Sequence, residues 1–126
     1  MEENFYDKIE EIDELTFNDL LCSNNQIKLK KEPKLNGIII IYAPWCFKCF
    51  SMITYWNNIS NLFKYKIKIM AYNTYNHLTK NEKLGYYIKL DKYPKYFFFH
   101  KNNNKLEEIE FKNEIDIENW ISLNSS

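Results

Sequence analysis

The sequence predicts an α/β fold in which a mixed central sheet is flanked by helices on both faces. Residues 38–42 form an unbroken β-branched and aromatic run, which is typical of a strand buried on both sides. The next strand is predicted at 67–72, and because a helix should connect it to the first, the two strands should be parallel. The strand-like runs 95–100 and 105–111 flank an Asn-rich turn and predict an antiparallel hairpin.

The beginning of the chain is predicted to lead into this sheet. The chain has 126 residues, the size of one domain. We expect the charged residues 1–11 to be an N-terminal extension and residues 12–126 to form the domain. A short strand is expected at 12–15, and Thr16 is a suitable N-cap for the helix that should follow. The polar, Lys-rich stretch 23–36 should be a connection that holds one short strand.

Three later helices are predicted around these strands. The first should run over residues 46–59, the second over 80–88, and the closing helix from Asn113 or Glu114 to Leu123. In the first and the last of these, apolar residues recur at helical spacing. The residues expected to face the core are Phe50, Ile53 and Trp56 in the first helix and Ile117, Trp120 and Ile121 in the last.

Charge and composition narrow the classes of function. Lys+Arg and Asp+Glu are equal at 17 each, so neither nucleic acid nor an anionic membrane is expected as a partner. The absence of Arg and Val indicates an AT-rich genome, such as that of a large DNA virus or a parasite. The sequence has no apolar run long enough for a bilayer and no signal-peptide pattern. We therefore expect a cytoplasmic protein, or a virion component if the source is viral.

Cys46 and Cys49 stand at the predicted start of a helix. Unpaired N–H groups and the helix dipole there favour a thiolate, and in C-x-x-C pairs the cysteine pKa falls from about 8.5 to between about 3.5 and 7.5. Cys46 should be the exposed nucleophile and Cys49 the resolving thiol behind it. Lys48 would add a favourable positive charge. The third cysteine, Cys22, is expected on the apolar side of the helix after Thr16, as a buried structural thiol.

The segment Tyr-Ala-Pro-Trp-Cys-Phe-Lys-Cys at 42–49 resembles the active site of the thioredoxin superfamily. That site usually reads aromatic-Ala-Pro-Trp-Cys-x-x-Cys at a strand–helix junction, and this form is similar to thioredoxins and to catalytic domains of protein disulfide isomerases. Tyr93-Pro94, just before a predicted strand, resembles the cis-proline loop of the same family. The resemblance extends over residues 12–122 and implies a thioredoxin fold.

The resemblance also implies roles for residues around the cysteine pair. In the family, the proline packs beside the disulfide, and the backbone of the preceding residue pairs with the substrate peptide. Trp45, Tyr93 and Pro94 are therefore expected to bind substrate. Phe47 and Lys48 replace the family's usual Gly-Pro or Gly-His between the cysteines, and we expect them to modulate the redox properties of the pair.

One departure from the family concerns its buried acid. The family has an Asp or Glu six residues before the first cysteine, and this chain has Ile40 there. The partner Lys of the family aligns near Ala71, so both charges are replaced together, which avoids a lone buried charge. Because the carboxylate helps deprotonate the second cysteine, we expect slower attack of Cys49 on a mixed disulfide.

Two other interpretations of the cysteine pair remain open. Cys46 and Cys49 could be half of a zinc site, but the remaining candidates Cys22, His77 and His100 are not spaced as a second ligand pair. Alternatively, the chain could be a redox-inactive thioredoxin-like module that binds peptides or has a structural role.

The function that the sequence favours is thiol–disulfide exchange on protein disulfides through Cys46 and Cys49. The Cys46 thiolate would attack a substrate disulfide, and Cys49 would then displace the substrate from Cys46; the oxidising direction reverses these steps. We expect no metal or organic cofactor. The expected partners are protein disulfide or dithiol substrates and a recycling reductase or oxidase. We expect the chain to be a monomer.

Overall fold

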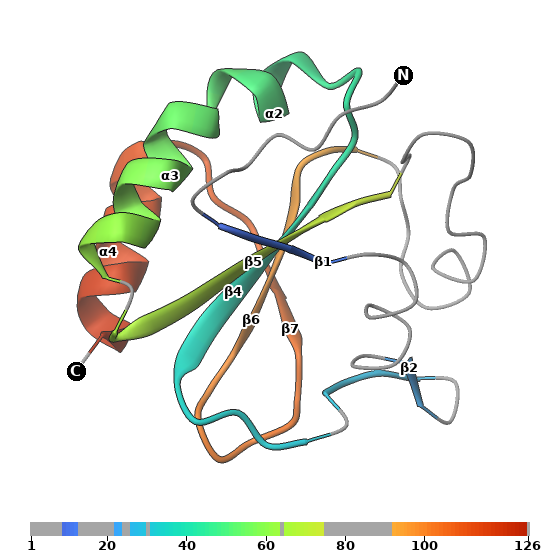
Figure 1. The fold of residues 1–126 in the computed structure, drawn as a ribbon, viewed down its shortest axis with the longest axis vertical. Helices are drawn as coiled ribbons and strands as arrows, with labels where there is room; N and C mark the ends of the chain where they lie inside the picture. The colour runs from blue at the N-terminus through green and yellow to red at the C-terminus, as the bar shows by residue number, and fades with distance from the viewer. Residues whose placement is uncertain are drawn as a thin grey trace.

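The computed structural model describes residues 9–12, 22–23, 26–29, 31–63, 65–74 and 92–125. Five strands form one mixed sheet in the order β1-β5-β4-β6-β7, with β4 in the centre (Figure 1). The strands are β1 (Glu10–Ile12), β4 (Asn36–Tyr42), β5 (Ile67–Asn73), β6 (Lys95–Phe99) and β7 (Glu107–Ile109). A separate two-stranded sheet pairs β2 (Cys22–Ser23) with β3 (Gln26–Ile27).

The pairing of the strands agrees with the sequence-based prediction. β4 runs parallel to β5 and antiparallel to β6, and β6 runs antiparallel to β7. The turn of this hairpin contains Asn102 at φ 64°, the left-handed conformation that Asn tolerates. β1 is parallel to β5 and forms the other edge. The predicted mixed sheet is therefore confirmed.

Three described helices pack on one face of this sheet. They are α2 (Phe47–Ser51), α3 (Ile53–Leu62) and α4 (Glu114–Asn124), and Figure 1 shows α3 and α4 on the same side of the strands. Asn113 caps α4, because its side-chain oxygen accepts a hydrogen bond from the Asp116 N–H at 3.1 Å. The helices predicted after Thr16 and at 80–88 lie outside the described residues.

Successive residues of β4 supply two separate cores, because side chains alternate between the faces of a strand. Ile38 and Ile40 pack with Trp56 of α3 and with Ile117 and Ile121 of α4, as predicted for these three helix residues. The cluster on the opposite face contains Ile39, Ile41, Met70, Phe97 and Phe99, together with Ile12, Leu29 and Leu106. The central strand is thus buried on both sides, as its continuous apolar run indicates.

The structure corrects two predictions near the N-terminus. The first strand covers Glu10–Ile12, so the sheet starts within the stretch expected to be an extension, whereas residues 13–15 of the strand predicted at 12–15 lie outside the described residues. Cys22 lies in strand β2 and not on a helix. Residues at the edge of a sheet need only a few backbone partners to form a strand, and local sequence patterns do not reveal such pairing.

The first predicted helix is also different from expectation. Residues 46–59 do not form one helix: α2 and α3 meet at Met52, whose backbone has φ −98° and ψ 0°. Ile53 and Trp56 face the core as predicted, but Phe50 is 62% exposed, so its predicted inward position is wrong. The break at Met52 changes the direction of the chain, and the helical spacing of α3 therefore does not extend back to Phe50.

Candidate functional site

Cys46 lies between the end of β4 and the start of α2, where it serves as the N-cap of the helix. Its backbone is extended, with φ −84° and ψ 113°. Its sulfur accepts a hydrogen bond from the Cys49 N–H at 3.2 Å, and its carbonyl accepts one from the Phe50 N–H at 3.1 Å. The sulfur thus satisfies one of the N–H groups that a helix start leaves unpaired. A hydrogen bond donated to the sulfur stabilises its charged form more than its neutral form.

Both sulfurs of the pair are shielded from solvent and present as free thiols. Cys46 is 8% exposed and Cys49 is 1% exposed. Cys46 is therefore the more accessible of the two, but it is nearly buried and not openly exposed as the sequence led us to expect. Cys49 is one turn into the helix and faces the core with Trp56 and Tyr96, which explains its burial.

The buried position of Cys49 affects its protonation. Burial raises the pKa of the Cys49 thiol well above its usual range, and the hydrogen bond with Cys46 raises it further. The Cys49 thiol therefore keeps its proton at neutral pH. Any reaction in which Cys49 attacks as a thiolate must first remove that proton.

The Tyr93-Pro94 loop lies directly beside Cys46. The peptide bond between these two residues is cis. The Cys46 thiol donates a hydrogen bond to the Tyr93 carbonyl oxygen, with the sulfur and oxygen 3.5 Å apart. The Tyr93 ring meets Trp45 edge to face, with ring centroids 5.2 Å apart. Of the predicted site residues, the structure thus brings Trp45, Cys46, Cys49 and Tyr93 together, with Pro94 half-buried next to them.

Phe47 and Lys48, the two residues between the cysteines, are both exposed to solvent, and Phe47 is 84% exposed. Lys48 borders two hollows beside the site: a small one next to Pro94, and a larger one of about 440 Å³ along the start of α4. Tyr96 lines both hollows.

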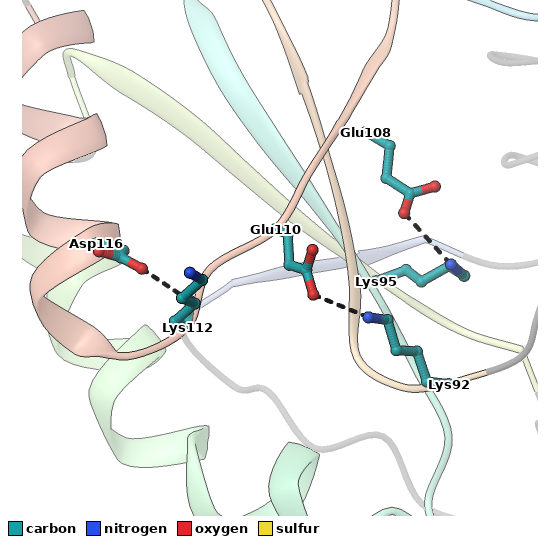
Figure 2. A network of polar contacts seen from close by, with 6 residues as sticks. All are labelled: Lys92, Lys95, Glu108, Glu110, Lys112 and Asp116. Atoms are coloured by element: carbon teal, nitrogen blue, oxygen red, sulfur yellow. Dashed lines mark hydrogen bonds and ion pairs between the residues drawn. The ribbon is translucent and has the colours of Figure 1, made fainter.

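Two ion pairs, which Figure 2 shows, line the smaller hollow. Lys92 and Glu110 form an ion pair at 2.9 Å, and Lys95 and Glu108 form one at 3.4 Å. The hydrogen bond and the charge of Lys92 hold the pKa of Glu110 below its usual range, with smaller contributions from Lys112 and Lys48.

Residue Tyr96 is a part of this site that sequence reasoning missed. Ile40, Ala71 and Tyr96 lie side by side in one row across β5, β4 and β6. Burial raises the pKa of Tyr96 well above its usual range, and a negative charge on either cysteine sulfur would raise it further. A neutral phenol therefore lies beside the apolar position where the family has an acid. Because Tyr96 sits within the aromatic run of β6, its sequence indicates only a core residue.

Glu11 is a second residue that the sequence did not point to. It pairs with Ala71 from the edge strand β1, in the same row of the sheet. Its carboxylate accepts a hydrogen bond from the hydroxyl of Tyr42, the last residue of β4. A carboxylate is therefore present in the row, but two strands away from Ile40, which is about 10 Å at the usual strand spacing.

The described residues contain no group of three or more His, Cys, Asp or Glu side chains placed to hold a metal ion. His100 packs edge to face on Phe98, with ring centroids 5.1 Å apart, and His77 lies outside the described residues. Among the residues that the structure describes, no helix combines the length and the apolar character needed to cross a membrane.

Solved structures of other proteins have a similar fold. The chain is similar to the J-Trx1 fragment of ERdj5 at a TM-score of 0.64 and 13% identity, with 93% of this chain and 50% of that fragment covered. It is similar to Chlamydomonas reinhardtii thioredoxin f2 at a TM-score of 0.67 and 13% identity, with 91% and 94% covered. These identities are low, so the likeness shows the fold alone.

A third solved structure contains a partner of its thioredoxin. It is the complex of ferredoxin:thioredoxin reductase with thioredoxin f2, similar at a TM-score of 0.66 and 16% identity, with 94% of this chain and 96% of that chain covered. No curated protein sequence matches this chain. The sequence model described as Thioredoxin, however, matches residues 17–122 and includes every residue of the candidate site except Glu11. The chain therefore belongs to the thioredoxin family.

Proposed function

We propose that this chain is a thiol–disulfide oxidoreductase that acts on protein disulfides through Cys46 and Cys49. The observation that carries the proposal is the pair itself: the Cys46 sulfur caps a helix and accepts the Cys49 N–H at 3.2 Å, with the second thiol buried behind it. Membership of the thioredoxin family supports the same chemistry.

The proposed reaction in the reducing direction has two displacements. The Cys46 thiolate attacks one sulfur of the substrate disulfide, which breaks that bond, forms a mixed disulfide and releases the other substrate sulfur as a thiolate. Cys49 then loses its proton and attacks the Cys46 sulfur. The mixed disulfide breaks, the Cys46–Cys49 bond forms, and two electrons have passed to the substrate. An external dithiol reductant would restore the pair, and the reverse sequence would oxidise a substrate.

The surface around Cys46 suits a polypeptide substrate. Trp45, Phe47 and Phe50 are large apolar side chains that lie exposed within four residues of Cys46. Exposed apolar groups gathered at one place are typical of a surface that contacts another protein. We propose that Trp45, Tyr93 and Pro94 contact the substrate beside the sulfur, and that Phe47 and Lys48 modulate the pair from the solvent side.

Replacing the nucleophile tests this function. Cys46→Ser is expected to abolish reduction of insulin by dithiothreitol, measured as turbidity, because a serine hydroxyl cannot form the mixed disulfide. Cys22→Ser is the matched control, since it removes a thiol from the separate β2–β3 sheet, and it should keep the wild-type rate. An inactive wild-type protein that still binds peptides would instead favour the redox-inactive module.

Restoring the acid of the family tests the role of Ile40. Ile40→Asp is expected to speed the attack of Cys49 on a mixed disulfide by about tenfold or more, because general bases contribute about 10²- to 10⁴-fold to proton transfer. Stopped-flow measurement of single-turnover resolution gives this rate. Ile40→Asn is the control, because it has the same shape but no carboxylate. Equal rates for the Asp and Asn variants would contradict the proposed role of the missing acid.

A further inference from the structure

We propose that Thr74 is a positioning residue, whose hydroxyl anchors Tyr93 and so holds the Tyr93 carbonyl oxygen against the Cys46 thiol. Thr74 follows the last residue of β5 and is buried. It touches neither cysteine, so its effect on the pair is transmitted through Tyr93. The proposal rests on the proposed function, because it assigns a role within the same site.

The hydroxyl of Thr74 joins two segments that are far apart in the sequence. Its oxygen lies 3.1 Å from the Tyr42 carbonyl oxygen and 3.2 Å from the Tyr93 hydroxyl oxygen. A threonine hydroxyl has one proton, and a carbonyl can only accept. The Thr74 hydroxyl therefore donates to Tyr42 and accepts from the Tyr93 hydroxyl. The Thr74 backbone N–H independently donates to the same Tyr42 carbonyl at 3.0 Å.

Tyr93 is thereby held at three places. Its hydroxyl is anchored on Thr74, its ring meets Trp45 at 5.2 Å, and its carbonyl accepts the Cys46 thiol at 3.5 Å. Because its hydroxyl and its ring are both held by contacts, Tyr93 has less freedom to turn its carbonyl away from the Cys46 sulfur. The end of β4, through Tyr42, is thus connected by hydrogen bonds to the atom that faces the nucleophilic sulfur.

The Tyr93 carbonyl and the start of the helix favour opposite protonation states of Cys46. The Cys49 N–H stabilises the thiolate, whereas an acceptor for the S–H proton stabilises the thiol. The carbonyl has a second lone pair that can accept a backbone N–H from an extended substrate. An anchored Tyr93 therefore holds its carbonyl where it stabilises the thiol form of Cys46. The same carbonyl can also accept a hydrogen bond from the substrate.

Removing the anchor should raise the reactivity of the Cys46 thiol and lower the affinity of the site for its substrate. In Thr74→Val and in Tyr93→Phe, iodoacetamide should alkylate Cys46 about three- to tenfold faster at pH 7, which is the scale of one neutral hydrogen bond. The midpoint of the alkylation pH profile should fall. The KM for reduction of a peptide disulfide should rise by a similar factor. Cys49, Tyr42 and Tyr96, which are titratable groups of the same buried cluster, are unchanged in both variants.

Two further variants separate positioning from packing. Thr74→Ser keeps the hydroxyl and should restore the wild-type alkylation rate and KM. The double variant Thr74→Val with Tyr93→Phe should be no more affected than either single variant, because both remove the same contact. Additive effects, or an alkylation rate equal to that of the wild type in both single variants, would overturn the proposal.

Labelling of Cys49, measured by mass spectrometry, distinguishes the positioning role of Thr74 from local unfolding of the site. Cys49 is 1% exposed, so it should stay unlabelled while Cys46 reacts faster. Equal acceleration at both cysteines would mean that the site opens, and it would overturn the positioning role. Alkylation does not depend on turnover. An inactive wild type would therefore refute the proposed function, whereas unchanged alkylation profiles in the variants would refute the anchor alone.

Discussion

Cys49→Ser is expected to accumulate a covalent adduct in which Cys46 is joined to its substrate by a disulfide. The first displacement needs only Cys46, so it should proceed in this variant. The second needs a sulfur nucleophile held next to the Cys46 sulfur, and a serine hydroxyl does not displace a disulfide. Because a well-placed intramolecular group has a very high effective concentration, resolution should slow by about a thousandfold or more.

The adduct is measured by non-reducing electrophoresis and mass spectrometry after incubation with a disulfide-containing protein. A reducing agent should release the substrate intact. Cys46→Ser with Cys49→Ser should give no adduct, and Cys22→Ser with Cys49→Ser should give the same amount as Cys49→Ser alone. An adduct located on Cys22, or no adduct with any disulfide substrate, would exclude Cys46 as the nucleophile.

Trp56→Ala is expected to cause the largest loss of stability among single substitutions near the site. Trp56 is 0% exposed and packs on Tyr96 and Phe111, with ring centroids 5.6 and 6.5 Å away. Truncating a buried tryptophan leaves a cavity and costs about 3 to 5 kcal/mol. Because domains are stable by only about 5 to 15 kcal/mol, the variant should unfold at a much lower urea concentration.

The chain offers a matched control for this substitution in Trp45, which is 65% exposed. Trp45→Ala should change the free energy of unfolding by less than about 1 kcal/mol, as is usual for exposed positions. It should nevertheless weaken substrate binding, because Trp45 lies against Tyr93 beside the sulfur. Urea unfolding followed by fluorescence, together with KM for insulin, separates the two effects. Equal loss of stability in both variants would contradict the core packing described above.

The sequence predicted the parts of the fold that depend on local patterns. The apolar runs located β4 and β5, the Asn-rich turn located the hairpin of β6 and β7, and Asn113 marked the start of α4. Periodic apolar spacing also placed Trp56, Ile117 and Ile121 in the core. In each case the sequence pattern and the structure that it predicts involve residues that are close in the sequence.

Other features depended on contacts between distant segments and could not be predicted. Phe50 has helical spacing but is exposed, because the helix breaks at Met52. Cys22 follows an apolar stretch, but it lies in a strand because its backbone pairs with Ile27 of β3. Neither outcome has a signature in local propensity.

The cysteine motif, its place before a helix and the membership of the thioredoxin family follow from the order of residues alone, because a strand–helix junction and a C-x-x-C pair are local features. Only tertiary structure decided how accessible the Cys46 sulfur is and which groups surround it. Tyr93 reaches that sulfur from 47 residues away, and Thr74 reaches Tyr93 from 19 residues away. Pairing across the sheet likewise brings Tyr96 beside Ile40. Such neighbours are set by strand order and register, which are properties of the folded sheet as a whole.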